Sequence, residues 1–182
     1  MLVLALIGKR ASGKNIFAEY LRDRYRFRLL DYTRDVLAPV LRKQGKPVTR
    51  ENLTALAMGL RKRYGNDILT KRLCRKISGN KSIVISGMRF PAEAAYLHRT
   101  FGDGFKLIAV EADPRLRYNR ARKRGIKGEK CLAFKEFIKL ESLPTERIIP
   151  RAMELADFVI ANNKTPRDLY RKIDNLMEKL NI

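Results

Sequence analysis

Residues 8–15 read GKRASGKN, which is the GxxxxGK pattern followed by Asn where Ser or Thr is common. A continuous apolar run over residues 2–7 precedes the pattern, and residues 15–25 carry apolar side chains at helical spacing. A glycine-rich turn between a buried strand and a helix presents backbone N–H groups to an anion. We therefore expect a phosphate-binding loop made of Gly8, Lys9, Arg10, Ala11, Ser12, Gly13, Lys14 and Asn15.

The types of residue in this loop indicate a nucleoside triphosphate as the ligand. Lys14 is expected to bring a mobile positive charge to the β- and γ-phosphates of ATP. The hydroxyl that would ligate Mg²⁺ in such a loop is replaced by Asn15, whose amide oxygen is a weaker ligand. We expect the metal ion to be held mainly by phosphates and water, with Asn15 as a weak metal ligand. A turn without any ligand is the less favoured alternative.

Four further short apolar runs, at residues 27–30, 82–86, 106–111 and 158–160, alternate with amphipathic segments. This alternation predicts an α/β fold of three layers, a five-stranded parallel sheet with helices on both faces. Helices are expected at 35–43, 49–64, 68–77, 91–100, 115–124, 134–140, 151–155 and 166–180. We treat residues 1–182 as one domain, with an acceptor-binding region over about 31–75 and a lid over about 115–150.

Composition excludes several other classes of protein. The chain has 182 residues, of which 45% are hydrophobic, so a sizeable core is expected and wholesale disorder is not. No apolar run approaches the roughly 18 residues of a membrane span, and the opening run resembles a buried strand more than a signal peptide. Two cysteines, Cys74 and Cys131, and one histidine favour neither a disulfide framework nor a zinc site. We expect a cytoplasmic protein without a membrane partner.

The charge of the chain is strongly positive. Forty Lys and Arg against nineteen Asp and Glu give a net charge of +21. Such a surface attracts polyanions, so phosphorylated small molecules, nucleic acid and anionic membrane surfaces are candidate partners. The basic residues are spread along the whole chain, which a basic proteome or a hot or salty habitat explains equally well. The sequence leaves the oligomeric state undetermined.

The loop and its context resemble the P-loop nucleoside monophosphate kinase superfamily over nearly the whole chain. The closest resemblance is to archaeal adenylate kinase-related proteins that are similar to dephospho-coenzyme A kinase. The loop and residues 85–94, ISGMRFPAEA, are also similar to the deoxynucleoside monophosphate kinases of phages. The resemblance implies phosphoryl transfer from ATP, with Mg²⁺, to a small nucleotide-like acceptor.

Residues 32–38, YTRDVLA, are similar to the TGDxLR segment that holds the acceptor nucleotide in adenylate kinases. Thr33 and Asp35 match that segment, whereas its arginine falls on Ala38 and Arg34 stands at the place of its glycine. The resemblance implies that Thr33 and Arg34 contact the acceptor, with Arg34 holding a phosphate from a different backbone position. The alternative is a helix N-cap with surface charges.

Residues 60–65, LRKRYG, are similar to an LRxxYG segment of the archaeal relatives. The resemblance implies that Arg61 contacts an acceptor phosphate and that Tyr64 stacks on a base. The alternatives are a solvated helix face for Arg61 and core packing for Tyr64, which lies at core spacing.

Arg89 follows the apolar run at 82–86, where ligands bind in parallel sheets. A guanidinium at this place grips an acceptor phosphate through two hydrogen bonds. The aspartate usual in the family is replaced by Ser86 and Gly87, so the metal ion loses a carboxylate. Glu93 is close in sequence, but it belongs to the next helix and carries little weight.

An arginine-rich segment follows Asp113 and resembles the lid helix of these kinases. Arg120 and Arg124 have the RxxxR spacing, so they share one face of a helix, where they would neutralise the migrating phosphoryl group. An arginine-rich surface helix and an RNA-binding helix are the alternatives. The adenine-side loop of the family falls on residues 161–165, which nominates Asn163 for the base by position alone.

The acceptor stays open at this stage. A monophosphate needs no base, because its attacking oxygen is already ionised, whereas a sugar hydroxyl benefits from a carboxylate that takes its proton. Asp31 and Asp35 both lie just past the second strand, where such a base is expected. The alternative function is an NTP-binding or NTP-hydrolysing P-loop protein that acts on RNA or a ribonucleoprotein, which the charge and the missing aspartate favour.

Overall fold

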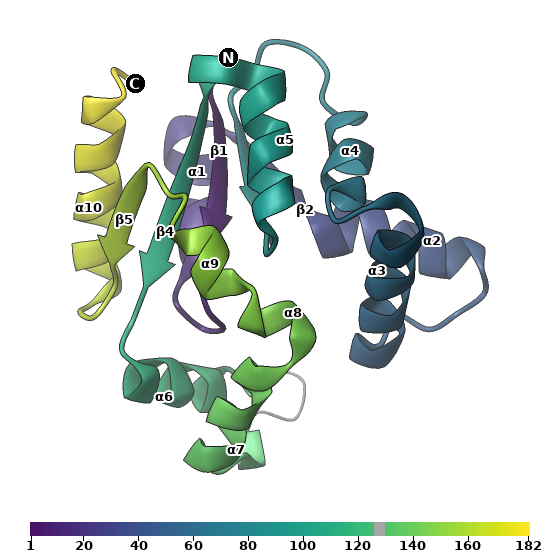
Figure 1. The fold of residues 1–182 in the computed structure, drawn as a ribbon. Coiled ribbons are helices and arrows are strands. Elements are labelled where there is room, and N and C mark those ends of the chain that lie inside the picture. The colour runs from purple at the N-terminus through teal and green to yellow at the C-terminus, as the bar shows by residue number, and fades with distance from the viewer. Residues whose placement is uncertain (126–129) are drawn as a thin grey trace.

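The computed structural model describes residues 1–125 and 130–182. Five parallel strands form one sheet in the order β2-β3-β1-β4-β5 (Figure 1). They are β1 (Val3–Ile7), β2 (Arg28–Asp31), β3 (Ile83–Ser86), β4 (Phe105–Glu111) and β5 (Phe158–Ala161). The predicted five-stranded parallel sheet is confirmed.

Helices connect the strands and account for most of the remaining described residues. They are α1 (Lys14–Tyr25), α2 (Ala38–Lys43), α3 (Arg50–Tyr64), α4 (Ile68–Cys74), α5 (Pro91–Phe101), α6 (Pro114–Arg124), α7 (Phe134–Lys139), α8 (Pro144–Arg147), α9 (Ile149–Met153) and α10 (Pro166–Lys179). Three short turns complete them, a π-helical turn at Tyr32–Leu37 and 3₁₀ turns at Gly102–Gly104 and Leu140–Ser142.

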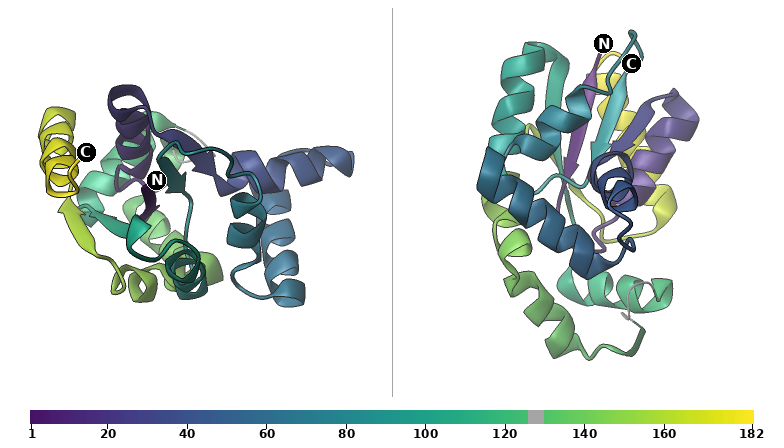
Figure 2. Two further views of the ribbon diagram at one scale, coloured as in Figure 1. Left: turned by 90° about the horizontal axis from the view of Figure 1, so that it is seen from above. Right: turned by 90° about the vertical axis from the view of Figure 1, so that its right-hand side faces the viewer.

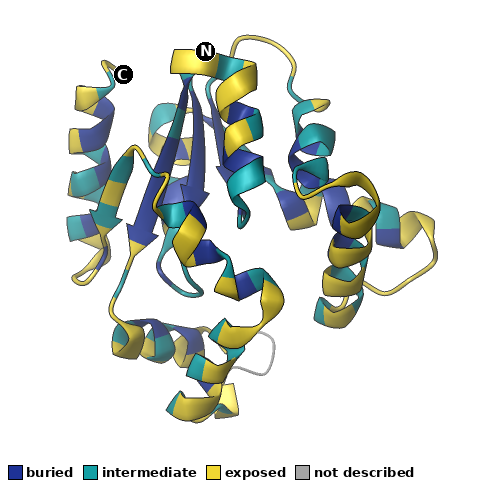
Figure 3. Cartoon of the chain, in the orientation of Figure 1, coloured by how far each residue is buried: buried dark blue, intermediate teal, exposed yellow. Residues whose placement is uncertain are grey.

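The sheet separates two apolar cores. Val3, Ala5 and Ile7 of β1 pack with buried residues of α4, α5 and α9, whereas Leu4 and Leu6 pack with residues of α1 and α10. All of β1 is buried, so its run of apolar residues has no alternation, as expected for a central parallel strand. In Figure 3 strands β1 and β3 and most of β4 are dark blue, whereas the edge strand β5 is teal and yellow.

The loops that carry the sequence motifs meet at one edge of the sheet. Because the strands are parallel, the loops after β1, β2, β3 and β4 all leave from their carboxyl ends. Helices α6, α7 and α8 lie beyond this edge (Figure 1), and α2 and α3 project to the side as an arm (Figure 2). The fold therefore places the predicted lid and acceptor regions on opposite sides of the loop after β1.

Some predicted boundaries were wrong. The helix expected at 35–43 is preceded by the π-helical turn, which begins after Asp31 because the Asp31 carboxylate accepts a hydrogen bond from the Arg34 N–H. Helix α4 ends at Cys74 rather than at 77, since the N–H groups of Lys76 and Ile77 bond to carbonyls three residues back. Helix α8 was not predicted, because its four residues are too few to show a helical period.

The core position of Tyr64 was also wrong. Its side chain is 47% exposed, and the guanidinium of Arg63 lies 5.2 Å from the centre of its ring. The last turn of α3 buries Arg61 against the Phe90 ring and leaves Tyr64 exposed. Within the described residues, the helices are too short or too polar to cross a membrane.

Candidate phosphate-binding site

The loop between β1 and α1 is a tight turn whose glycines are required by close contacts. Gly8 and Gly13 have φ values of 151° and 109°. A Cβ atom at Gly8 would lie 2.2 Å from the Val110 carbonyl oxygen, and one at Gly13 would lie 2.1 Å from the Asn162 side-chain nitrogen. The left-handed Ala11, with a φ of 57°, completes the turn. The backbone therefore curls as an anion-binding loop requires.

The side chain of Lys14 folds back onto its own loop. Its Nζ donates hydrogen bonds to the carbonyl oxygens of Gly8 at 2.7 Å and Lys9 at 2.9 Å. Burial lowers the pKa of Lys14, the positive charges of Arg89, Arg117 and Arg124 add to this effect and the charge of Glu146 opposes it, so that the pKa is about 7. The charges of Arg89 and Arg124 therefore act at this lysine, whereas the roles predicted for them at the acceptor and in the lid stay predictions.

Asn162 connects the loop after β5 to the phosphate loop by a hydrogen bond. It is buried, and its side-chain nitrogen donates to the Ser12 carbonyl at 2.8 Å. Arg120 Nη2 donates to the Lys164 carbonyl at 3.3 Å, whereas its Nη1 is buried without a partner in the described residues. Asn163, predicted to read the base, accepts a hydrogen bond from the Asp113 N–H at 2.8 Å. Sequence reasoning missed Asn162, since only its contact with Ser12 distinguishes it from its neighbour.

Arg117 is a functional candidate that the sequence analysis passed over. It is 2% exposed, and its Nε donates to the Ala112 carbonyl at 3.0 Å while Nη1 lies 3.4 Å from the Arg10 carbonyl oxygen. Arg117 therefore joins the first turn of α6 to the phosphate loop. The signal was present, because residues 117, 120 and 124 lie three and four apart and share one face of a helix.

Two carboxylates neutralise the cations around the loop. Glu141 contacts Lys9 at 2.9 Å and forms a short ion pair with Arg117. Burial opposes the ionisation of Glu141, but the hydrogen bonds from these two cations outweigh it and lower the pKa of Glu141. Glu146 lies 3.2 Å from Arg89 Nε and is 8% exposed. Neither glutamate was predicted, because both approach the site from a segment far away in the sequence.

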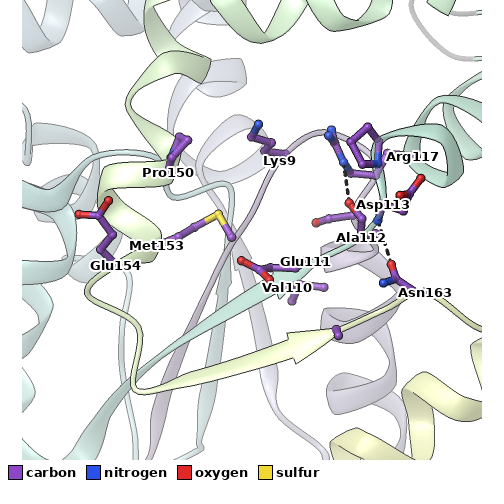
Figure 4. A pocket seen from close by; sticks show the side chains of 13 residues that line it. Lys9, Val110, Glu111, Ala112, Asp113, Arg117, Pro150, Met153, Glu154 and Asn163 are labelled. Carbon is purple, nitrogen blue, oxygen red and sulfur yellow. Dashed lines mark hydrogen bonds between the residues drawn. The ribbon is translucent and has the colours of Figure 1, made fainter.

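A cavity of about 520 Å³ opens beside the loop. Figure 4 shows Lys9 and Met153 on one side of it, and Asp113, Arg117 and Asn163 on the other. The cavity thus runs from the phosphate loop to the loop after β5. Its volume and its position at the carboxyl ends of β4 and β5 fit a small ligand such as a nucleoside.

The predicted acceptor residues after β2 form a network of their own. Asp35 accepts hydrogen bonds from the Asp31 N–H at 2.7 Å and from Arg34 Nη2 at 2.8 Å. Burial opposes this charge, but Arg34 and the N–H outweigh it and lower the pKa of Asp35. The Arg34 guanidinium is thus held by Asp35 and by the Leu29 carbonyl, while Thr33 is exposed. Their contacts with an acceptor stay predictions.

Arg61 lies in the interior. It is 6% exposed, its Nη2 is 2.8 Å from Glu93 Oε1, and its guanidinium lies 4.3 Å from the centre of the Phe90 ring. Glu93 is fully buried and also accepts from the Arg89 N–H at 2.8 Å. Glu93 therefore has a structural role that the sequence analysis did not foresee, because this carboxylate connects the arm to the loop that carries Arg89.

The described residues offer little to a metal ion. They contain no group of three His, Cys, Asp or Glu side chains arranged to hold one. Asn15 is exposed on the first turn of α1, and Ser86 and Gly87 end β3 without a carboxylate of their own. The carboxylate of Asp31 lies next to Gly87, since a Cβ atom there would be 3.5 Å from Asp31 Oδ2. These donors fit Mg²⁺ only as a supplement to nucleotide phosphates and water.

The sequence has relatives over its full length, although no family model matches it. A UPF0200 protein of Pyrococcus horikoshii is 30% identical over 184 residues, which cover 98% of this chain and 97% of the relative. The chain belongs to the UPF0200 family. A UPF0200/UPF0201 protein of Archaeoglobus fulgidus is 30% identical over 188 residues. This UPF0200 chain spans 56% of the length of that relative, which is therefore a longer protein.

Solved structures show which fold the UPF0200 chain has. Shikimate kinase from Bacteroides thetaiotaomicron superposes with a TM-score of 0.66 at 14% identity, covering 100% of this chain and 99% of that one. A gluconokinase from Sinorhizobium meliloti gives 0.54 at 15% identity, covering 98% and 95%. The UPF0200 chain thus has the fold of these P-loop kinases, which confirms the predicted fold class. A closer relation to adenylate kinase-related or dephospho-coenzyme A kinase-like proteins stays a prediction.

Proposed function

We propose that this chain is an ATP-dependent kinase of a small, nucleotide-like acceptor. The observation that carries the proposal is Lys14, whose ammonium is folded onto its own loop with a pKa lowered to about 7. A lysine crowded by Arg89 and Arg117 is destabilised in its charged form until a polyanion arrives. Nucleotide phosphates supply that anion, and the loop N–H groups and the start of α1 add to their binding.

The donor site extends from the loop to the cavity beside it. We assign the base and ribose of ATP to the cavity bounded by Arg117 and Asn163. Nη1 of Arg120 is buried without a hydrogen-bond partner among the described residues, although Arg120 does not itself line the cavity. Bound with the nucleotide, Mg²⁺ would neutralise charge on its phosphates, with Asn15 and Asp31 as the nearest candidate outer ligands.

The acceptor side favours a hydroxyl over a monophosphate. Arg34 is paired with Asp35, Arg61 with Glu93 and Arg89 with Glu146, so all three predicted phosphate-binding arginines are already neutralised. An incoming phosphate would have to displace a carboxylate from each. Asp31 lies at the carboxyl end of β2, and one of its oxygens approaches Gly87 at the end of β3. We assign Asp31 as the base that takes the proton of the attacking hydroxyl.

Nucleotide binding is tested first, because the kinase requires it. Titration calorimetry with ADP and Mg²⁺ should show binding to the wild type and none to Lys14→Ala, with both chains folded by circular dichroism. Unchanged affinity in Lys14→Ala would overturn the assignment of the loop. Lys123→Ala, on the exposed side of α6, controls for the loss of one positive charge.

The acceptor is identified with labelled ATP and a panel of candidate acceptors, each tested separately. The panel contains nucleoside monophosphates and hydroxyl acceptors, including dephospho-coenzyme A. We expect transfer to a hydroxyl, and Asp31→Asn should lower kcat about 10²- to 10⁴-fold, the usual contribution of a general base. Asn keeps an oxygen for the Arg34 N–H, so the turn should stay intact. Asp103→Asn, at an exposed position, is the matched control. Transfer to a monophosphate with full activity in Asp31→Asn would exclude the hydroxyl assignment.

A second candidate function is supported by the net charge of +21. Helix α6 carries six Lys or Arg in eleven residues, and Arg115, Arg122 and Lys123 are exposed. An NTP-dependent protein that acts on RNA or a ribonucleoprotein would use such a surface for phosphate contacts. RNA binding whose affinity falls steeply with salt, together with hydrolysis of ATP without any small acceptor, would favour this function.

A further inference from the structure

Residues 140–147 lie across the candidate phosphate site and carry two acidic side chains that contact it. Glu141 pairs with Lys9 of the loop and with Arg117 of α6. Glu146 pairs with Arg89 at the end of β3. We call these eight residues the acidic strap; they comprise the 3₁₀ turn Leu140–Ser142 and α8.

The glutamates of these three ion pairs are largely removed from water, whereas the Lys9 and Arg89 side chains are 39% and 38% exposed. The Glu141 and Glu146 side chains are 15% and 9% exposed, although the strap itself is a surface segment whose Ser142, Leu143 and Pro144 are exposed. The carboxylates therefore point inward from a segment that contributes little to the core. Carboxylates and phosphates bind arginine in the same way, so each glutamate occupies a place that suits a phosphate.

We propose that the acidic strap is an autoinhibitory segment: Glu141 and Glu146 hold the cations of the phosphate site until a polyphosphate displaces them. The proposal rests on the proposed function, because it takes the loop as a polyphosphate site. Its geometric basis is that both carboxylates of one short segment contact cations from three elements of the site.

The movement that the proposal requires is a swing of the strap between two buried anchors. Buried residues stand on either side of it, Phe137 in α7 and Ile149 in α9, whereas its own helix has only four residues. A swing between these two anchors would free Lys9, Arg117 and Arg89 without disturbing the sheet. A ligand that binds only the released state has an apparent affinity reduced by the fraction of molecules in that state. Weakening the ion pairs of the strap should therefore raise the apparent affinity of the site for a polyphosphate.

The test uses inorganic tripolyphosphate, which has no base and no acceptor group, and titration calorimetry of the full chain. Glu141→Gln and Glu146→Gln keep the shape of each side chain and remove its charge. Each variant loses one charge-assisted contact that competes with the phosphate, so we expect each to bind tripolyphosphate about tenfold more tightly than the wild type. The double variant should bind more tightly still. Glu178→Gln, at an exposed position of α10, gives the same change in net charge and should leave the affinity unchanged.

A second readout follows the strap itself. The chain has no tryptophan, so Leu143→Trp places a single fluorophore on the strap at a residue that is 41% exposed. Tripolyphosphate should shift its emission, and the Gln variants should show the shifted emission without ligand. Equal or weaker binding by the Gln variants, with binding still lost in Lys14→Ala, would overturn the strap and leave the phosphate site standing. If neither the wild type nor the Gln variants bind tripolyphosphate through Lys14, the proposed function fails and the strap fails with it.

Discussion

The guanidinium of Arg61 lies 2.8 Å from the Glu93 carboxylate, and both side chains are almost completely buried. The other Glu93 oxygen accepts from the N–H groups of Arg89 and Phe90. One carboxylate therefore joins α3 of the arm to the loop that presents Arg89. This relationship means that the arm and the loop after β3 share a structural support.

Removing the charge of Glu93 should destabilise the whole chain. Glu93→Gln leaves the Arg61 charge buried without a counter-charge, which lowers the free energy of unfolding by about 3–5 kcal/mol. Urea denaturation measures the change, and Glu51→Gln, exposed on α3, should stay within about 0.5 kcal/mol of the wild type. The double variant Arg61→Met/Glu93→Gln removes both charges and keeps an oxygen for the Arg89 and Phe90 N–H groups, so it should regain much of the loss. A Glu93→Gln chain as stable as the wild type would show that this pair has no structural role.

Nucleotide binding should take up a proton at neutral and alkaline pH. The pKa of Lys14 is lowered to about 7 in the free chain, and bound phosphate should raise it because phosphate stabilises the ammonium. Proton uptake is therefore absent well below pH 7, grows as pH rises through 7, and is accompanied by weaker affinity at higher pH.

Calorimetry of ADP binding in buffers of different ionisation enthalpy measures this uptake. We expect close to one proton at pH 8.5 and almost none at pH 5.5. In Lys14→Arg, whose guanidinium stays charged throughout, the alkaline uptake should disappear. The same proton count in both chains would assign the uptake to another group.

Arg89 should matter more to the acceptor than to ATP. It lies at the carboxyl end of β3, on the side of the arm, and Arg89→Ala removes the guanidinium that is free to bind an anionic group of the acceptor once Glu146 has moved. We expect the KM of the acceptor to rise at least tenfold and that of ATP to change less. Arg99→Ala, exposed near the end of α5, serves as the control. Equal rises for both substrates would contradict the assignment.

Two neighbouring asparagines should differ sharply in their effect on the phosphate loop. Asn162→Ala leaves the buried Ser12 carbonyl without its donor, which should lower the free energy of unfolding by about 1–3 kcal/mol and weaken ADP binding. Asn163→Ala removes an exposed bond to the Asp113 N–H and should change stability by less than about 1 kcal/mol. Thermal unfolding and ADP titration of the pair measure both effects, and identical losses would argue against a special role for Asn162.

Much of the fold was predictable because its signals are local. The parallel sheet follows from short apolar runs separated by helical patterns, and the phosphate loop follows from the spacing of Gly8, Gly13 and Lys14 after a buried strand. Helix starts such as Thr49 and Asp113 were also visible, because a capping side chain acts within three residues of itself. The boundary at residue 35 failed because a π-helical turn leaves no regular period to recognise.

The environment of each site residue depended on contacts that the chain order conceals. Glu141 meets Lys9 across 132 positions of the sequence, and Asn162 meets Ser12 across 150. Arg34 and Arg61 looked alike as basic residues, but the fold pairs one with an adjacent aspartate and buries the other against a glutamate 32 residues away.

The sequence alone therefore determined that a polyanion loop sits at the carboxyl edge of a parallel sheet, since backbone curvature and strand burial are encoded within a few residues. Only the tertiary structure decided which charges surround that loop and which carboxylates already neutralise them. Electrostatic interaction depends on distance and burial in space, and neither is a property of position along the chain.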